Sequence, residues 1–146
     1  MDYAKNSDMR ADYKPTAEEI SRFSQKEKEL REKLFSRKDE EKKRNPAEAS
    51  YERLAERCGV SADLMKRIFL GTATVTREFI LKFAYGLEMC REEVDQYLEL
   101  CGGRLDPDNR PEDMCFCACL RDNDPIEIFV EELKNLQKKI NANSSR

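Results

Sequence analysis

Hydrophobic and polar positions between residues 54 and 71 follow the pattern of two short helices separated by a tight turn. Gly59 stands where the first helix must end, because glycine adopts positive φ without steric cost. Ser61 begins the second helix, since its hydroxyl can accept from a backbone N–H of the first turn. Apolar residues then recur at helical spacing up to Gly71: Leu64, Met65, Ile68 and either Phe69 or Leu70. The pattern predicts a helix-turn-helix outline with its second helix over residues 62–70.

The sequence before this pair predicts one long charged helix. Thr16 and Glu19 form a capping box, with the threonine as N-cap, and the helix continues roughly to Lys43. Its apolar stripe is thin and has a gap around Glu27: Ile20, Phe23, Leu30, Leu34 and Phe35. Such a stripe can dock on a domain or seed a helix pair, but it is too short and interrupted for a coiled coil. Residues 21–44 carry ten basic and six acidic side chains, a net charge of +4.

Proline at position 46 interrupts the helical pattern, because it disfavours helix at the residue before it. The next helix therefore starts at Asn45 or at Ser50, and each of these residues can serve as a cap. Residues 45–104 hold eight basic and ten acidic side chains, so this part of the chain has a net charge of −2.

The rest of the chain predicts further helices. Broad apolar faces are expected over residues 76–87 and from Cys90 onward, ending at Gly102-Gly103. Residues 111–120 are expected to form a short buried helix, with a strand as the alternative. Asp124 caps the last helix, with Pro125 at its first position. The expected organisation is a flexible tail (1–15), a charged helix (16–44), a central domain (45–104), a C-terminal helical extension packed on it (105–140) and a polar tail (141–146).

The central residues resemble the helix-turn-helix of the Xre/Cro phage-repressor family. Residues 76–87 are similar to the fourth helix of that family, and Cys90 to Val94 to the start of its fifth. The match extends from roughly Ser50 to Leu98, about a third of the chain. The resemblance implies an all-α, lambda-repressor-like helix-turn-helix bundle, here with a charged N-terminal helix and a C-terminal helical extension. It also favours Ser50 as the start of the second helix.

The resemblance implies a DNA-binding transcriptional regulator. In that family, side chains at the start and on the outer face of the second motif helix meet base edges in the major groove. The matching positions here are Ala62, Asp63, Lys66 and Arg67. Arg67 can offer two donors to guanine, and Lys66 can meet a base or a phosphate. Ala62 can touch a thymine methyl group, and Asp63 can accept only from cytosine.

A DNA-binding face would be extended by Arg77 and by part of residues 21–44. The partner implied by the resemblance is double-stranded DNA, bound by a homodimer on paired half-sites, and no cofactor is implied. The chain departs from the family, however, because many members are polar around Asp63 and Leu64 and acidic at the position of Phe69. The alternative is a protein-interaction module that keeps the fold without binding DNA. It would contact a partner protein through Leu64, Phe69 and Leu70.

Composition narrows the classes of function. The chain has 146 residues, 39% charged and 39% apolar, which allows one domain with a real core. A net charge of −3 counts mildly against nucleic-acid binding. The sequence has no histidine, which removes the commonest general base and metal ligand, and we expect no enzymatic activity.

The polar N-terminus and the lack of a long apolar run lead us to expect a cytoplasmic protein. The first twenty residues are polar, so we expect no signal peptide, and no apolar run approaches membrane-spanning length. The six cysteines are then expected to be thiols. We expect Cys115, Cys117 and Cys119 to bind no metal, because the paired turns that supply four zinc ligands are missing.

Overall fold

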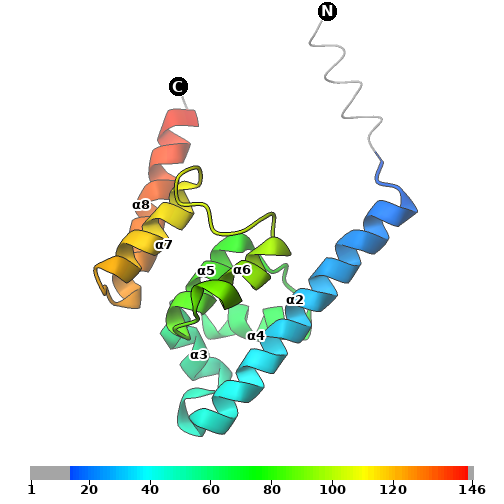
Figure 1. The fold of residues 1–146 in the computed structure, drawn as a ribbon, viewed down its shortest axis with the longest axis horizontal. Helices are drawn as coiled ribbons and strands as arrows, with labels where there is room; N and C mark the ends of the chain where they lie inside the picture. Colours follow the sequence, from blue (N-terminus) through cyan, green and yellow to red (C-terminus); the bar gives the residue numbers. More distant parts are fainter. Residues whose placement is uncertain (1–13, 145–146) are drawn as a thin grey trace, which may run out of the picture.

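The computed structural model describes residues 14–144, and within that range the chain is helical and contains no strand. Seven α-helices and one short 3-10 helix follow one another along these residues (Figure 1). They are α2 (Ala17–Arg44), η1 (Pro46–Glu48), α3 (Tyr51–Cys58), α4 (Ala62–Leu70), α5 (Arg77–Gly86), α6 (Arg91–Glu99), α7 (Pro111–Arg121) and α8 (Ile126–Ser144). The predicted all-α class is confirmed, and α7 is a helix rather than the alternative strand. Most of the predicted N-terminal tail lies outside the described residues.

Side-chain caps set the starts of four helices. The hydroxyl of Thr16 accepts from the backbone N–H of Glu19, and that of Thr76 from the N–H of Phe79. Ser50 accepts from the N–H of Arg53, which settles the start of α3 in favour of Ser50 over Asn45. Local hydrogen bonding at Ser and Thr therefore fixes these boundaries. Thr16 is the cap that the sequence predicts, and Ser50 is one of its two alternatives.

The core lies where α3, α4 and α5 meet the C-terminal half of α2. Phe83 of α5 and Leu54 of α3 are fully buried there, Leu34 of α2 is fully buried with them, and Leu30 at the middle of α2 has 3% of its surface exposed. The N-terminal half of α2 projects away from this bundle (Figure 1). Leu30 and Leu34 therefore dock on the domain, while the same helix continues beyond it.

Gly86 marks the closest approach between α5 and α3. A Cβ atom at this position would lie 2.5 Å from the backbone oxygen of Arg57 and 2.8 Å from the sulfur of Cys58. Real Cβ atoms do not come this close to backbone, so the packing distance between the two helices depends on glycine here.

The last two helices form a pair that packs on α5. Tyr85 of α5 stacks on Phe129 of α8 with ring centroids 5.0 Å apart, and Phe116 of α7 meets Phe129 edge to face at 5.7 Å. The Tyr85 hydroxyl also donates to the backbone oxygens of Cys119 and Asp124. This aromatic cluster attaches the C-terminal pair to the central bundle.

Two predicted boundaries of α8 were wrong. The helix begins at Ile126, which puts Pro125 at the N-cap position and leaves Asp124 outside the helix. The backbone oxygen of Asp124 accepts a hydrogen bond from the Tyr85 hydroxyl. The helix also continues to Ser144, so residues 141–144 of the predicted polar tail are helical. None of the described helices is long and apolar enough to cross a membrane.

Candidate nucleic-acid interface

The turn between α3 and α4 is built by three residues with distinct roles. Gly59 ends α3 at φ 67° and ψ 34°, the left-handed conformation that glycine adopts without a steric penalty. Its N–H donates to the oxygens of Ala55 and Glu56. The Ser61 hydroxyl then accepts from the N–H of Leu64 at 3.1 Å, which confirms Ser61 as the N-cap of α4. The orientation of α4 is therefore fixed by backbone geometry as well as by packing.

The inner face of α4 is anchored in the core. Met65 and Ile68 are buried, as predicted, and so is Phe69 with 4% of its surface exposed. The Phe69 ring packs between Phe35 of α2, at 5.0 Å between centroids, and Tyr51 of α3, at 5.4 Å. The expectation that Phe69 faces a partner protein was wrong, because its ring is buried within the molecule against Phe35 of α2.

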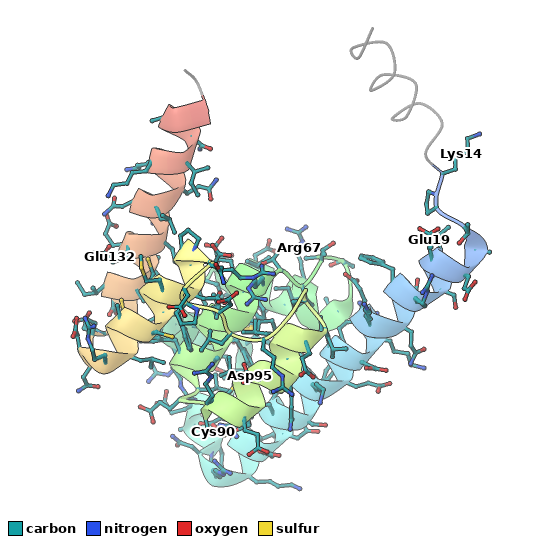
Figure 2. All side chains as sticks on the ribbon, turned by 45° about the horizontal axis from the view of Figure 1, so that its top comes forward. Lys14, Glu19, Arg67, Cys90, Asp95 and Glu132 are labelled. Atoms are coloured by element: carbon teal, nitrogen blue, oxygen red, sulfur yellow. The ribbon has the colours of Figure 1, made fainter. Side chains whose placement is uncertain are left out.

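The outer face of α4 presents the predicted contact residues to solvent. Asp63, Lys66 and Arg67 have 81%, 47% and 51% of their side-chain surface exposed, and Figure 2 shows Arg67 at the surface of the bundle. Ala62 and Leu64 are half-buried. Leu70 is 75% exposed. The structure thus brings four of the five predicted DNA-contacting residues together on one helix.

Both cations on this face have an acidic neighbour. The Lys66 Nζ lies 2.9 Å from an oxygen of Glu52 on α3, and an Arg67 nitrogen lies 3.7 Å from Asp63 one turn earlier. The hydrogen bond from Lys66 lowers the pKa of the Glu52 carboxyl, and the same bond raises the pKa of Lys66. Glu52 is the residue of this face that the sequence pattern missed, because its position depends on how α3 crosses α4.

Arg77 does not belong to this face. Its guanidinium donates to both carboxylate oxygens of Asp113, at 3.2 and 2.6 Å, and to the backbone oxygens of Gly103 and Arg104. Asp113 is completely buried and also accepts from the N–H of Asp106. The expected role of Arg77 in DNA contact was therefore wrong: this side chain ties α5 to α7 and to the loop between α6 and α7.

One cation of α2 reaches the end of α4. The guanidinium of Arg31 lies beside Gly71, since a Cβ atom built there would be 3.6 Å from its Cζ atom. Arg31 also pairs with Glu27 at 3.5 Å. A positive charge near a helix C-terminus is favourable to the helix. Part of the charged helix thus lies next to the end of α4.

The C-terminal extension covers the other side of the turn. A Cβ atom at Gly59 would lie 2.4 Å from a methyl carbon of Val130 and 3.1 Å from a side-chain carbon of Ile126. Both residues belong to α8, so α8 packs directly on the turn between α3 and α4. This contact therefore fixes the end of α3 against α8.

The cysteines give no sign of a second site. Within the described residues, no group of three or more cysteine, aspartate or glutamate side chains is placed to hold a metal ion. All six thiols are unpaired with one another. Burial raises the pKa of Cys119 to about 11 and that of Cys58 to about 12, so these thiols stay protonated at neutral pH. The expected absence of metal binding stays a prediction.

None of the protein-family models, curated proteins or solved structures compared with this chain matches it. Functional inference therefore rests on the residues and their geometry.

Proposed function

We propose that this chain is a non-catalytic DNA-binding regulator in which α2–α6 form a lambda-repressor-like helix-turn-helix bundle and α4 reads the major groove. The two-sided character of α4 carries the proposal. Met65, Ile68 and Phe69 fix one side of the helix in the core. The opposite side presents polar and charged side chains at helical spacing. A recognition helix needs this combination of a rigid inner face and an open outer face.

Each exposed side chain of α4 has a role in this proposal. Arg67 offers paired donors to a guanine edge, and Lys66 provides a point charge that suits a phosphate. Ala62 is small enough to approach a thymine methyl group at the start of the helix, and Asp63 accepts from cytosine. Arg31, at the far end of α4, adds a phosphate contact from α2.

The ion pairs on this face are compatible with DNA binding. Glu52 and Asp63 are both more than half exposed, so water and salt screen their attraction for Lys66 and Arg67. Phosphates can therefore replace these carboxylates as partners. The same acids repel the DNA backbone, which lowers non-specific affinity and leaves specific base contacts to supply the binding energy.

Two observations support the non-catalytic part of the proposal. The sequence contains no histidine. Burial also raises the pKa of the Cys101 thiol to about 11, as it does for Cys58 and Cys119, so these sulfurs are poor nucleophiles at neutral pH.

A second candidate function rests on Leu70. This side chain is 75% exposed at the end of α4, and Leu64 of the same helix is half-buried. Because the charges beside it are neutralised within the molecule, the same face would suit a partner protein that covers an apolar spot. In that case α4 is a docking helix, and DNA binding is lost from the face.

Selection from random duplex DNA at two salt concentrations tests the proposed function. DNA binding predicts an enriched sequence whose affinity falls steeply as salt rises. Absence of enrichment and of salt-dependent binding would overturn it. Replacement of Leu70 by serine separates the two candidates, because it removes a protein contact and changes no charge.

A further inference from the structure

One face of α2 carries a row of four cations, which we call the basic stripe. Its members recur at steps of three, seven and four residues, so they lie on the same side of the helix: Lys28, Arg31, Lys38 and Lys42. Ser24 and Phe35 fill the remaining positions of this row, so no carboxylate interrupts it, although Glu27 and Asp39 border it. Lys28 and Lys42 are exposed. The stripe therefore offers positive charge to solvent along half of the helix.

Contacts with two neighbouring helices fix the direction in which the basic stripe faces. The ring centroid of Phe35, in the middle of the stripe, lies 5.0 Å from that of Phe69 on α4. The Nζ of Lys38 lies 4.7 Å from the ring centroid of Tyr51, at the start of α3. Arg31 lies beside the end of α4. The stripe thus borders α3 and α4, the two helices of the helix-turn-helix outline.

The acids of α2 gather on a different side of the helix, toward α6. Four glutamates line a groove of about 470 Å³ between these two helices: Glu29, Glu32, Glu40 and Glu93. Lys33 and Arg37 are the cations of the same groove, so acids exceed cations by two there. A polyanion is therefore attracted to the side of α2 that borders α4 and repelled from the side that borders α6.

The basic stripe has the position and the length to meet a DNA backbone when α4 lies in the major groove. Packed helices lie about 8–10 Å apart and the major groove is about 12 Å wide, so a helix packed on α4 lies over a wall of the groove, where the phosphates are. Lys28 and Lys42 are separated by roughly 21 Å along the axis of α2, whereas the whole of α4 spans roughly 14 Å. The stripe therefore extends past the end of α4.

We propose that the basic stripe binds the phosphates of the DNA strand beside the groove that α4 reads, with Lys28, Lys38 and Lys42 as contacts in addition to Arg31. This inference rests on the proposed function, because it needs α4 in the groove. Lysine suits a phosphate as a point charge. Phosphate contacts carry no sequence information, so the stripe supplies affinity and orients the chain on the duplex, whereas α4 supplies the sequence preference.

Fluorescence anisotropy of the full chain over a range of salt concentrations tests the stripe, on the selected duplex and on an unrelated duplex of equal length. Lys28→Ala should reduce the slope of the logarithm of the binding constant against the logarithm of salt concentration by about 0.9 on both duplexes, because one phosphate contact is lost. The triple variant Lys28→Ala/Lys38→Ala/Lys42→Ala should reduce the slope by about 2.7 and leave the ratio of the two affinities unchanged.

The matched control is Lys134→Ala/Lys138→Ala/Lys139→Ala on α8, which removes the same charge away from α2 and should keep the slope of the parent. Circular dichroism compares the helix content of each variant with that of the parent, and the exposed Lys28 allows a single substitution that leaves packing unchanged.

The outcomes separate this inference from the proposed function. If the parent binds DNA and Lys66→Ala lowers the salt slope, but the stripe variants keep the slope of the parent, the stripe is overturned and the role of α4 stands. Equal losses in the stripe variant and in the α8 control would also overturn it, because net charge alone would then act. A parent that binds no DNA overturns both proposals.

Discussion

The Nζ of Lys66 lies 2.9 Å from a carboxylate oxygen of Glu52, so the cation predicted to meet DNA is paired across the turn with an acid from the preceding helix. The pair neutralises one of the two cations on the outer face of α4. It also places a negative charge where a phosphate would approach Lys66. Under the proposed function, Glu52 therefore limits how strongly this face attracts nucleic acid.

We expect Glu52→Gln to strengthen DNA binding. The change frees Lys66 from its ion pair and removes a carboxylate that the DNA phosphates repel. The slope of the logarithm of the DNA-binding constant against the logarithm of salt concentration should therefore become steeper by about one. Fluorescence anisotropy with a labelled duplex measures the slope. Glu18→Gln is the control, because it changes net charge equally on the projecting end of α2. Equal effects of the two variants would show that net charge alone matters.

The buried pair of Arg77 and Asp113 should be a major source of stability. Asp113→Ala leaves a largely buried guanidinium without its carboxylate, and we expect it to lower the free energy of unfolding by about 3–5 kcal/mol. Urea denaturation measures the loss. Asp108→Ala, which removes an exposed carboxylate from the loop before α7, should leave the unfolding midpoint unchanged. A small effect at Asp113 would mean that the loop relaxes and hydrates the arginine.

Gly86→Ala should destabilise the chain by overpacking. The added methyl group would meet the backbone of Arg57 at 2.5 Å, and backbone cannot move aside as a flexible side chain can. We expect a loss of about 1–3 kcal/mol in unfolding free energy. Thermal denaturation followed by circular dichroism checks this. An unchanged midpoint would show that α3 and α5 can separate without cost.

Alkylation should distinguish the cysteines by burial. Cys90 is exposed, whereas Cys58 and Cys119 are buried, and their pKa values are raised to about 12 and 11. A thiol with a raised pKa stays protonated, and therefore unreactive, until the pH approaches that value. At pH 8, iodoacetamide should modify Cys90 first and spare Cys58 until the protein unfolds. Mass spectrometry of timed samples measures the order, and early labelling of Cys58 would contradict the burial.

Local rules allowed much of the fold to be predicted. Thr16, Ser50 and Ser61 cap helices because a side-chain oxygen reaches a backbone N–H three residues later. Gly59 and Gly71 end helices at positive φ. Each of these effects involves residues that are close in sequence, so pattern and residue type were sufficient.

Contacts between distant segments could not be predicted in this way. Arg77 and Asp113 are 36 residues apart, and nothing in the sequence around either residue indicates the other. The helical spacing of Phe69 allows either a buried or a solvent-facing side chain. The ring is buried because Phe35 of α2 packs against it, a contact that the sequence does not indicate. The exposure of Asp63, Lys66 and Arg67 on α4 therefore agrees with the sequence pattern, whereas the placements of Arg77 and Phe69, which depend on tertiary packing, do not.

Binding of the full chain to its selected duplex over a range of salt concentrations tests most directly whether α4 lies in the major groove. Lys66→Ala should weaken binding to all sequences alike and reduce the salt slope by about one. Arg67→Ala should cost roughly 1–3 kcal/mol on the selected duplex and relax the preference at one base position. Affinity and slopes identical to the parent in both variants would contradict DNA recognition by α4.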